Sequence, residues 1–196
     1  ALKVAFDWKT RLNLEAGRNS CPGDKILHFQ QAFHGRSGYT LSLTNTAPEK
    51  TDLFPKFDWP RVVNPKVRFP SDAMEVERVA RVEAECREEI LGCFASHPNR
   101  IAAIIVEPIQ GEGGDNHFRK EFFEDLRRIA DDEEALLIFD EVQTGFGLTG
   151  KMWAYQHFDV APDILCFGKK SQVCGIMAGE RIDRVKDNVF HVSSRI

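Results

Sequence analysis

Apolar positions along the chain follow two spacings, one typical of helices and one typical of buried strands. They recur every three or four residues over residues 1–9, 79–94 and 118–129, which predicts three amphipathic helices. Ser71 stands shortly before the second of these stripes, where it can cap the helix. Helices of this kind must bury their apolar faces against another layer of structure.

Continuous apolar runs lie between these stripes. Residues 101–106, 135–139 and 164–167 are almost entirely apolar, as expected for strands that are buried on both faces. Residues 25–30 predict a further short strand, and residues 40–43 are a candidate for another. Buried strands separated by helices indicate an α/β fold with a mostly parallel central sheet flanked by helices.

Residues 45–70 interrupt this alternation. The segment holds five prolines and shows little periodicity. Four aromatic residues could anchor it to the rest of the molecule: Phe54, Phe57, Trp59 and Phe69. We therefore predict a long ordered loop or lid rather than a linker.

Composition narrows the class of protein. Hydrophobic residues make up 42% of the chain, charged residues 29%, and the net charge is −4, so a basic surface for nucleic acid is not expected. No apolar run approaches the length of a membrane span. The five cysteines form no CxxC pair, so we expect no metal site and a reducing, cytoplasmic location.

Ligands of parallel α/β sheets bind beyond the carboxyl ends of the strands. Glu107 and Glu112 lie there in a glycine-rich turn, which is either a capping loop or a site for cationic groups. Asp140 ends an apolar run and is costly to bury unless a cation pairs with it. If the strand continues, Val142 shares its face and Glu141 faces the other side, an arrangement suited to a flat protonated ring. A capping aspartate paired with a distant arginine is the alternative.

Two more segments carry candidate chemistry. Lys169 and Lys170 follow the last apolar run, where an amine can act as a nucleophile toward carbonyls, although two solvated lysines are the simpler interpretation. Phe33 could stack on a ring, and Arg36 could bind a carboxylate, whereas His34 alone is more often structural. The combination fits pyridoxal phosphate, which requires a lysine, an anion for its ring nitrogen, and packing on both ring faces.

Four motifs make the chain resemble the class III pyridoxal-phosphate aminotransferases of fold type I, over residues from about 25 to 180. They are Phe33-His34-Gly35-Arg36, Glu107-Pro108-Ile109-Gln110-Gly111-Glu112, Asp140-Glu141-Val142-Gln143-Thr144-Gly145 and Gly168-Lys169. The resemblance implies that residues 1–196 form the large cofactor domain of that fold. It also implies truncation at both ends, with an N-terminal segment, a phosphate-binding turn and a C-terminal small domain outside the chain.

The resemblance assigns cofactor contacts by position. Lys169 matches the lysine that forms the Schiff base with pyridoxal 5′-phosphate. Asp140 matches the partner of the pyridine nitrogen, and Gln143 the residue beside the phenolic oxygen. Phe33 and Val142 match the residues that pack on the two faces of the ring.

It also implies substrate contacts. Arg36 resembles the arginine that binds the α-carboxylate of the substrate. Glu112 resembles a switch glutamate that lets one site accept both an amino donor and 2-oxoglutarate. Glu107 is expected to give structural support, and Lys170 is the second choice for the Schiff-base lysine.

Residues 167–179 resemble the branch of this family that acts on the ε-amino group of L-lysine. The implied reaction passes that group to 2-oxoglutarate, giving glutamate and the 6-semialdehyde, in a parent that is a homodimer. We expect the 196 residues alone to bind the cofactor weakly and to show little activity. The alternatives are an ornithine or 4-aminobutyrate type of ω-aminotransferase and a non-catalytic domain. A dinucleotide-binding domain is disfavoured because no GxGxxG follows the first strand.

Overall fold

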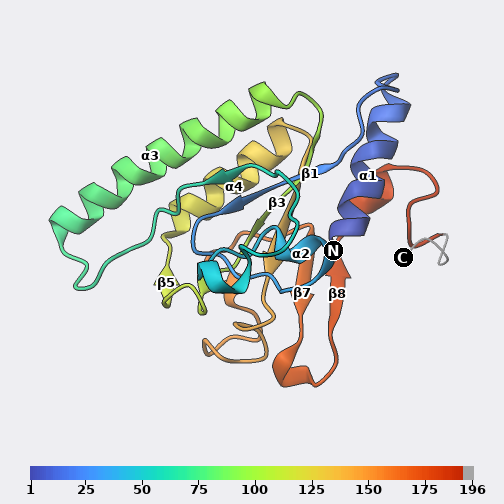
Figure 1. Cartoon of the computed structure of the whole chain (residues 1–196). Helices are drawn as coiled ribbons and strands as arrows, with labels where there is room; N and C mark the ends of the chain where they lie inside the picture. Colours follow the sequence, from blue (N-terminus) through green and yellow to red (C-terminus); the bar gives the residue numbers. More distant parts are fainter. Residues whose placement is uncertain (192–196) are drawn as a thin grey trace.

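The computed structural model describes residues 1–191, whose centre is a six-stranded sheet in the order β2-β1-β3-β6-β7-β8 (Figure 1). Neighbouring strands run parallel from β2 to β7, and β8 runs antiparallel to β7. The prediction of an α/β fold with a mostly parallel sheet is confirmed. The strands are β1 (Lys25–Phe29), β2 (Arg61–Val62), β3 (Ile101–Val106), β6 (Leu136–Asp140), β7 (Ile164–Phe167) and β8 (Gly175–Ala178).

Helices cover both faces of this sheet. Figure 1 shows α3 (Ala73–Ser96) and α4 (Lys120–Asp132) on one side and α1 (Leu2–Glu15) on the other. Successive residues of β6 enter opposite cores: Phe139 packs in the core that contains α3 and α4, whereas Ile138 packs in the core that contains α1. This alternation explains why the strand is apolar at nearly every position.

The predicted helices are present, with different ends. The first extends six residues beyond the predicted residue 9, to Glu15. The cap of α3 is Asp72 rather than Ser71, because an Asp72 oxygen accepts a hydrogen bond of 2.9 Å from the backbone N–H of Glu75. Within residues 1–191, none of the helices has the length and apolar character that crossing a bilayer requires.

The candidate strand at residues 40–43 is wrong. The chain instead forms a single helical turn, α2 (Gly38–Leu41), which continues in tight turns through Thr44. Both edges of β1 are already occupied, by β2 and by β3, so this segment does not pair with β1. Short alternating patterns fit either structure until the available edges are known.

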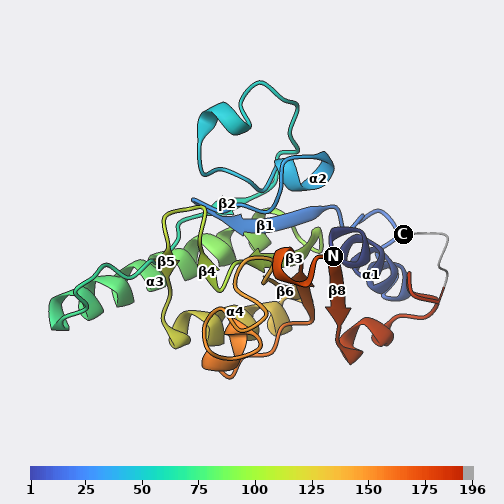
Figure 2. The same cartoon turned by 90° about the horizontal axis from the view of Figure 1, so that it is seen from below.

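The loop over residues 45–70 is ordered and contains β2, but it is anchored differently from the prediction. Trp59 is 8% exposed, whereas Phe54, Phe57 and Phe69 are all more than half exposed. Phe57 stacks on Trp59 with ring centroids 5.0 Å apart. Figure 2 shows the part of this loop between α2 and β2 projecting beyond the β2–β1 edge of the sheet.

Short elements at the strand ends escaped the sequence analysis. A two-stranded hairpin of β4 (Ile109–Gln110) and β5 (Asn116–His117) follows β3. The antiparallel pairing of β7 with β8 encloses a turn that carries both candidate lysines. The remaining helical turns are η1 (Pro48–Lys50), η2 (Ala154–His157), η3 (Lys169–Ser171) and η4 (Glu180–Arg184).

Candidate active site

The carboxyl ends of four parallel strands meet around one small cavity of about 120 Å³. Asp140 is the last residue of β6, and Glu107 directly follows β3. Lys169 lies two residues beyond β7, and Phe33 lies in the turn after β1. The lining residues are Phe33, His34, Gly35, Glu107, Asp140, Val142, Gln143 and Lys169.

A buried histidine pairs with the aspartate. Nδ1 of His34 lies 2.8 Å from Oδ2 of Asp140, and the imidazole is the donor because a carboxylate accepts. Oδ1 of Asp140 accepts from the backbone N–H of Val142 at 3.1 Å. Burial by itself lowers the pKa of His34, but the hydrogen bond and charge of Asp140, with the charge of Glu107, outweigh it and raise that pKa. The sequence favoured a structural role for His34, because a lone histidine is more often structural. Its pairing with Asp140 spans 106 positions, so no local pattern shows it.

The amine of Lys169 is held at the cavity. Its Nζ donates to Oε1 of Gln143 at 2.8 Å, and its backbone has φ +49°, in the left-handed region that non-glycine residues rarely adopt. Lys170 turns elsewhere: its Nζ donates to the backbone carbonyls of Gln143, at 2.9 Å, and Gly145, at 3.5 Å. Lys169 is therefore the lysine that borders the cavity beside Asp140.

Glu107, expected to give structural support, borders the cavity and is only 4% exposed. Its Oε1 accepts from the backbone N–H of Phe33 at 2.9 Å, which fixes the aromatic residue at the cavity wall. Burial raises the pKa of Glu107 to about 7, against the opposing effects of His34 and the Phe33 N–H. A carboxyl that titrates near neutral pH thus lies within this site.

The next carboxylate along the chain, Glu141, faces away from the cavity. Its oxygens accept from the backbone N–H groups of Ala154, at 2.7 Å, and Tyr155, at 2.9 Å, and from the hydroxyl of Thr144 at 3.0 Å. These bonds tie the end of β6 to the following loop. The predicted separation of Asp140 and Val142 from Glu141 is confirmed, because only the first two line the cavity.

The glycine-rich turn after β3 packs very closely against Gln143 and against the backbone of Gln31. A Cβ at Gly111 would lie 2.1 Å from the Gln143 amide nitrogen. A Cβ at Gly113 would lie 2.1 Å from the backbone carbonyl oxygen of Gln31. The glycines therefore permit close approach to neighbouring groups.

Two predicted substrate residues lie outside the cavity lining. Arg36 is exposed, and Glu112 forms an ion pair with Lys50, a residue that sequence reasoning did not single out. The Lys50 ammonium also lies 5.8 Å from the centre of the Phe33 ring. The hydrogen bond and charge of Lys50 lower the pKa of Glu112, with smaller contributions from the charges of Lys169 and Arg36. Glu112 is thus electrostatically linked to the site although it does not line it.

A second cavity of about 430 Å³ adjoins the first and shares His34, Asp140 and Val142 with it. Its other walls include the first turn of α1 and Cys166 of β7. The His34–Asp140 pair therefore separates a small cavity beside the lysine from a larger one beside the first turn of α1.

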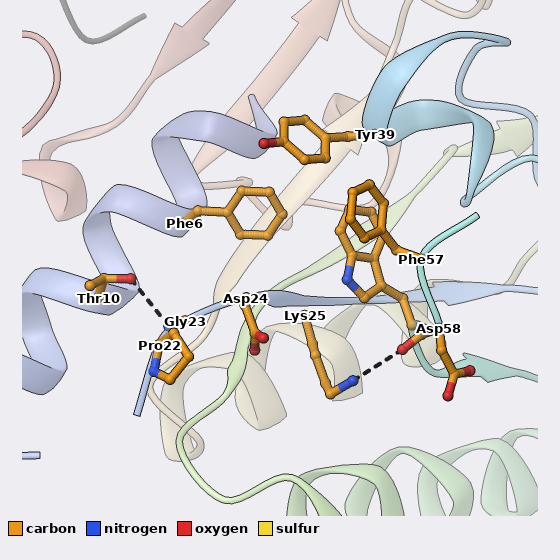
Figure 3. Close-up of a pocket in the computed structure, with 10 residues that line it drawn as sticks. Phe6, Thr10, Pro22, Gly23, Asp24, Lys25, Tyr39, Phe57 and Asp58 are labelled. Atoms are coloured by element: carbon orange, nitrogen blue, oxygen red, sulfur yellow. Dashed lines mark hydrogen bonds between the residues drawn. The ribbon is translucent and has the colours of Figure 1, made fainter. Parts of the chain in front are cut away.

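A third cavity, of about 470 Å³, lies toward the amino end of β1 (Figure 3). Phe6, Tyr39 and Phe57 form an aromatic wall. Lys25 there donates to the backbone carbonyl of Asp58 at 3.0 Å. This cavity shares no lining residue with the one beside Lys169 and lies away from the carboxyl ends of the parallel strands, so it is not the candidate active site.

Comparisons with known proteins agree with the motifs. The family model "Aminotransferase class-III" matches residues 1–192. The L-lysine-epsilon aminotransferase of Mycobacterium tuberculosis is 57% identical over 196 residues, all of this chain and 43% of that protein. The protein of the same name from Streptomyces clavuligerus is 48% identical over the whole chain and 42% of its own length. A 4-aminobutyrate aminotransferase from Emericella nidulans is 42% identical over 82% of this chain and 33% of its own.

The solved structure described as lysine aminotransferase from M. tuberculosis in the internal aldimine form matches with a TM-score of 0.95 and 57% identity. The match covers 100% of this chain and 44% of that one. The chain thus spans less than half the length of the curated relatives that it matches.

Proposed function

Because this chain belongs to the class III aminotransferases, we propose that the protein transfers the ε-amino group of L-lysine to 2-oxoglutarate, with pyridoxal 5′-phosphate as cofactor. The products are glutamate and the 6-semialdehyde. One observation carries the proposal: the Lys169 amine and the Asp140 carboxylate border the same cavity. In this proposal the chain supplies the cofactor-binding large domain.

The residues around the cavity fit this cofactor. Phe33 and Val142 offer apolar surface to a ring, and Asp140 offers a fixed negative charge to a ring nitrogen. Nε2 of His34 is buried and lacks a hydrogen-bond partner among residues 1–191, so a polar group is missing from its surroundings. The adjoining cavity, lined in part by the first turn of α1, shares His34, Asp140 and Val142 with this site. When bound, pyridoxal phosphate supplies an aldehyde that condenses with amines and a protonated ring that accepts electrons.

Lys169 holds the cofactor and moves the proton. With the cofactor bound, Nζ of Lys169 would act as the base and acid that moves the proton at the substrate carbon carrying the nitrogen. Gln143 accepts a hydrogen bond from Nζ and so keeps the amine directed at the cavity. Lys169 has a left-handed backbone conformation, and its side chain points to the cavity. The side chain of Lys170 instead donates to a backbone carbonyl of the neighbouring loop.

Asp140 keeps a proton on the ring nitrogen, because a nearby negative charge favours the charged form of the ring. The hydrogen bonds from His34 and from the Val142 N–H fix the orientation of this carboxylate. A prealigned anion that is largely shielded from water stabilises positive charge without having to reorganise during the reaction.

Substrate recognition uses the exposed side of the site. The guanidinium of Arg36 binds the α-carboxylate, with the planar geometry that suits a bidentate pair. Glu112 faces the variable part of the substrate, which differs between a lysine donor and the dicarboxylate acceptor. The charges of Arg36 and Lys169 both act on Glu112, which supports placing all three around one substrate.

The proposal is tested in a protein of the relatives' full length that carries these residues. Borohydride reduction with pyridoxal phosphate, followed by peptide mass spectrometry, should place the label on Lys169. A panel of lysine, ornithine and 4-aminobutyrate with 2-oxoglutarate should show the highest kcat/KM with lysine. A label elsewhere contradicts the site, and preference for another donor contradicts the substrate while leaving the reaction class standing.

We also propose that the protein is a cytoplasmic homodimer. The support for dimerisation is apolar surface on the loop beyond the β2–β1 edge, where Leu53 is 92% exposed and Phe54 and Phe57 are more than half exposed. The support for a reducing location is that all five cysteines are free. Light scattering during size-exclusion chromatography should give twice the mass of the full-length chain, and fractionation should place the protein in the cytoplasm.

A further inference from the structure

Lys50 is the cation that holds Glu112. The two side chains form an ion pair between η1 and the glycine-rich turn after β3, across 62 positions of the sequence. The Lys50 side chain is 21% exposed and that of Glu112 is 44% exposed. An ion pair with this exposure contributes little to stability, because water and salt screen it.

Two further contacts fix where the Lys50 ammonium lies. Its Nζ donates to Oγ1 of Thr46 at 3.3 Å and lies 5.8 Å from the centre of the Phe33 ring. Phe33 is part of the cavity wall beside Asp140 and Lys169. Lys50 therefore fastens the loop over residues 45–70 to the edge of the candidate active site, with Glu112 as the movable partner.

The two substrates of the proposed reaction make opposite demands on Glu112. An amino donor tolerates a carboxylate beside it, whereas the second carboxylate of 2-oxoglutarate is repelled by one at short range. If one site accepts both substrates, the glutamate must move away from the acceptor when the acceptor binds. A nearby cation is needed to stabilise the carboxylate in that position. Lys50 supplies one at the rim, outside the lining of the cavity.

We propose that Lys50 is a positioning residue that holds Glu112 away from the acceptor and so lets the site accept a dicarboxylate. This inference rests on the proposed function and deepens it. Lys50 acts through Glu112 and does not itself bind the acceptor. Without Lys50, Glu112 is drawn toward the positive charges of Lys169 and Arg36, and it repels the second carboxylate.

The test separates the two half-reactions in a full-length protein that carries these residues. Lys50→Met should raise KM for 2-oxoglutarate about fivefold, the size expected when one partly exposed ion pair is lost, and should change KM for lysine less than twofold. Lys50→Arg should restore the acceptor KM. Lys56→Met is the matched control, because Lys56 lies in the same loop and pairs with Asp52 at 3.3 Å.

A double-mutant cycle distinguishes holding from direct binding. In a Glu112→Gln background, Lys50→Met should leave the acceptor KM unchanged, because no charge needs to be held aside. Equilibrium binding of glutarate, an unreactive dicarboxylate, measured by calorimetry, should follow the same pattern. A fivefold loss that persists in the Glu112→Gln background overturns the proposal, as does an equal effect on both half-reactions or no effect of Lys50→Met.

The glutarate arm keeps this test separate from the proposed function. Failure of the wild-type protein to use lysine contradicts the proposed donor, while glutarate binding still reports on Lys50. Failure of the wild-type protein to bind glutarate overturns the role of Lys50 whatever the donor is.

Discussion

Glu107 makes the stability of the fold depend on pH, and the fold should become less stable as pH rises. Burial raises its pKa from 4.5 to about 7. The folded protein therefore binds more protons at this carboxyl than the unfolded chain does between these two pH values. Its contribution to the free energy of unfolding must fall as pH rises through that window and then stay constant.

The magnitude follows from the two pKa values. Each pKa unit corresponds to about 1.4 kcal/mol, so the whole rise corresponds to a destabilisation on the order of 3 kcal/mol above pH 7. Between pH 5 and pH 8 the linkage relation gives about 2.5 kcal/mol of this. Glu107→Gln removes the titration and keeps a carbonyl oxygen that can accept from the Phe33 N–H.

Urea unfolding of wild type and Glu107→Gln at several pH values from 5 to 8 measures this difference. From pH 5 to pH 8, the free energy of unfolding of Glu107→Gln should rise by about 2.5 kcal/mol relative to that of the wild type. Glu85→Gln, at an exposed position of α3, is the matched control for removing one negative charge. A difference between Glu107→Gln and wild type that stays flat with pH would refute the reasoning, because it would mean that Glu107 has the same pKa folded and unfolded.

Four further outcomes are expected. Lys169→Ala should abolish borohydride-trapped cofactor in peptide mass spectra while Lys170→Ala retains it; the reverse pattern would assign the wrong lysine. His34→Ala should lower the free energy of unfolding by about 1–3 kcal/mol, because it leaves the buried carboxylate at the end of β6 without its 2.8 Å partner; an unchanged urea midpoint contradicts that pairing. Gly113→Ala should lower the melting temperature, because its Cβ meets a backbone carbonyl at 2.1 Å. Gly92→Ala should raise it, because that helical position has open space.

Hydrophobic spacing alone predicted the frame of this fold. The apolar runs became β3, β6 and β7 because strands covered on both faces need apolar residues at nearly every position. The stripe over residues 118–129 became α4 for the same kind of reason. The two-residue strand β2 and the β4–β5 hairpin were missed, because such short segments carry too few residues for either period to appear.

Residues at strand ends could be predicted to lie together, because the carboxyl ends of parallel strands lie at the same edge of the sheet. The parallel pairing of β6 and β7 is enough to place Asp140 and Lys169 at one edge of the sheet. His34 and Lys50 could not be placed in this way. Their partners, Asp140 and Glu112, lie 106 and 62 positions away, and both depend on the paths of loops that no periodicity describes.

The cavity beside Lys169 is assembled from residues 33 to 169, so it exists only after β1, β3, β6 and β7 have docked side by side. Pairings across such separations form slowly. A molecule that binds there recognises the finished sheet alone, and at a hundred times its dissociation constant it adds about 2.7 kcal/mol to the native state. Because the ligand binds only the folded protein, it slows unfolding rather than speeding folding. Protection from proteolysis would therefore show that the ligand is bound, before any turnover is measured.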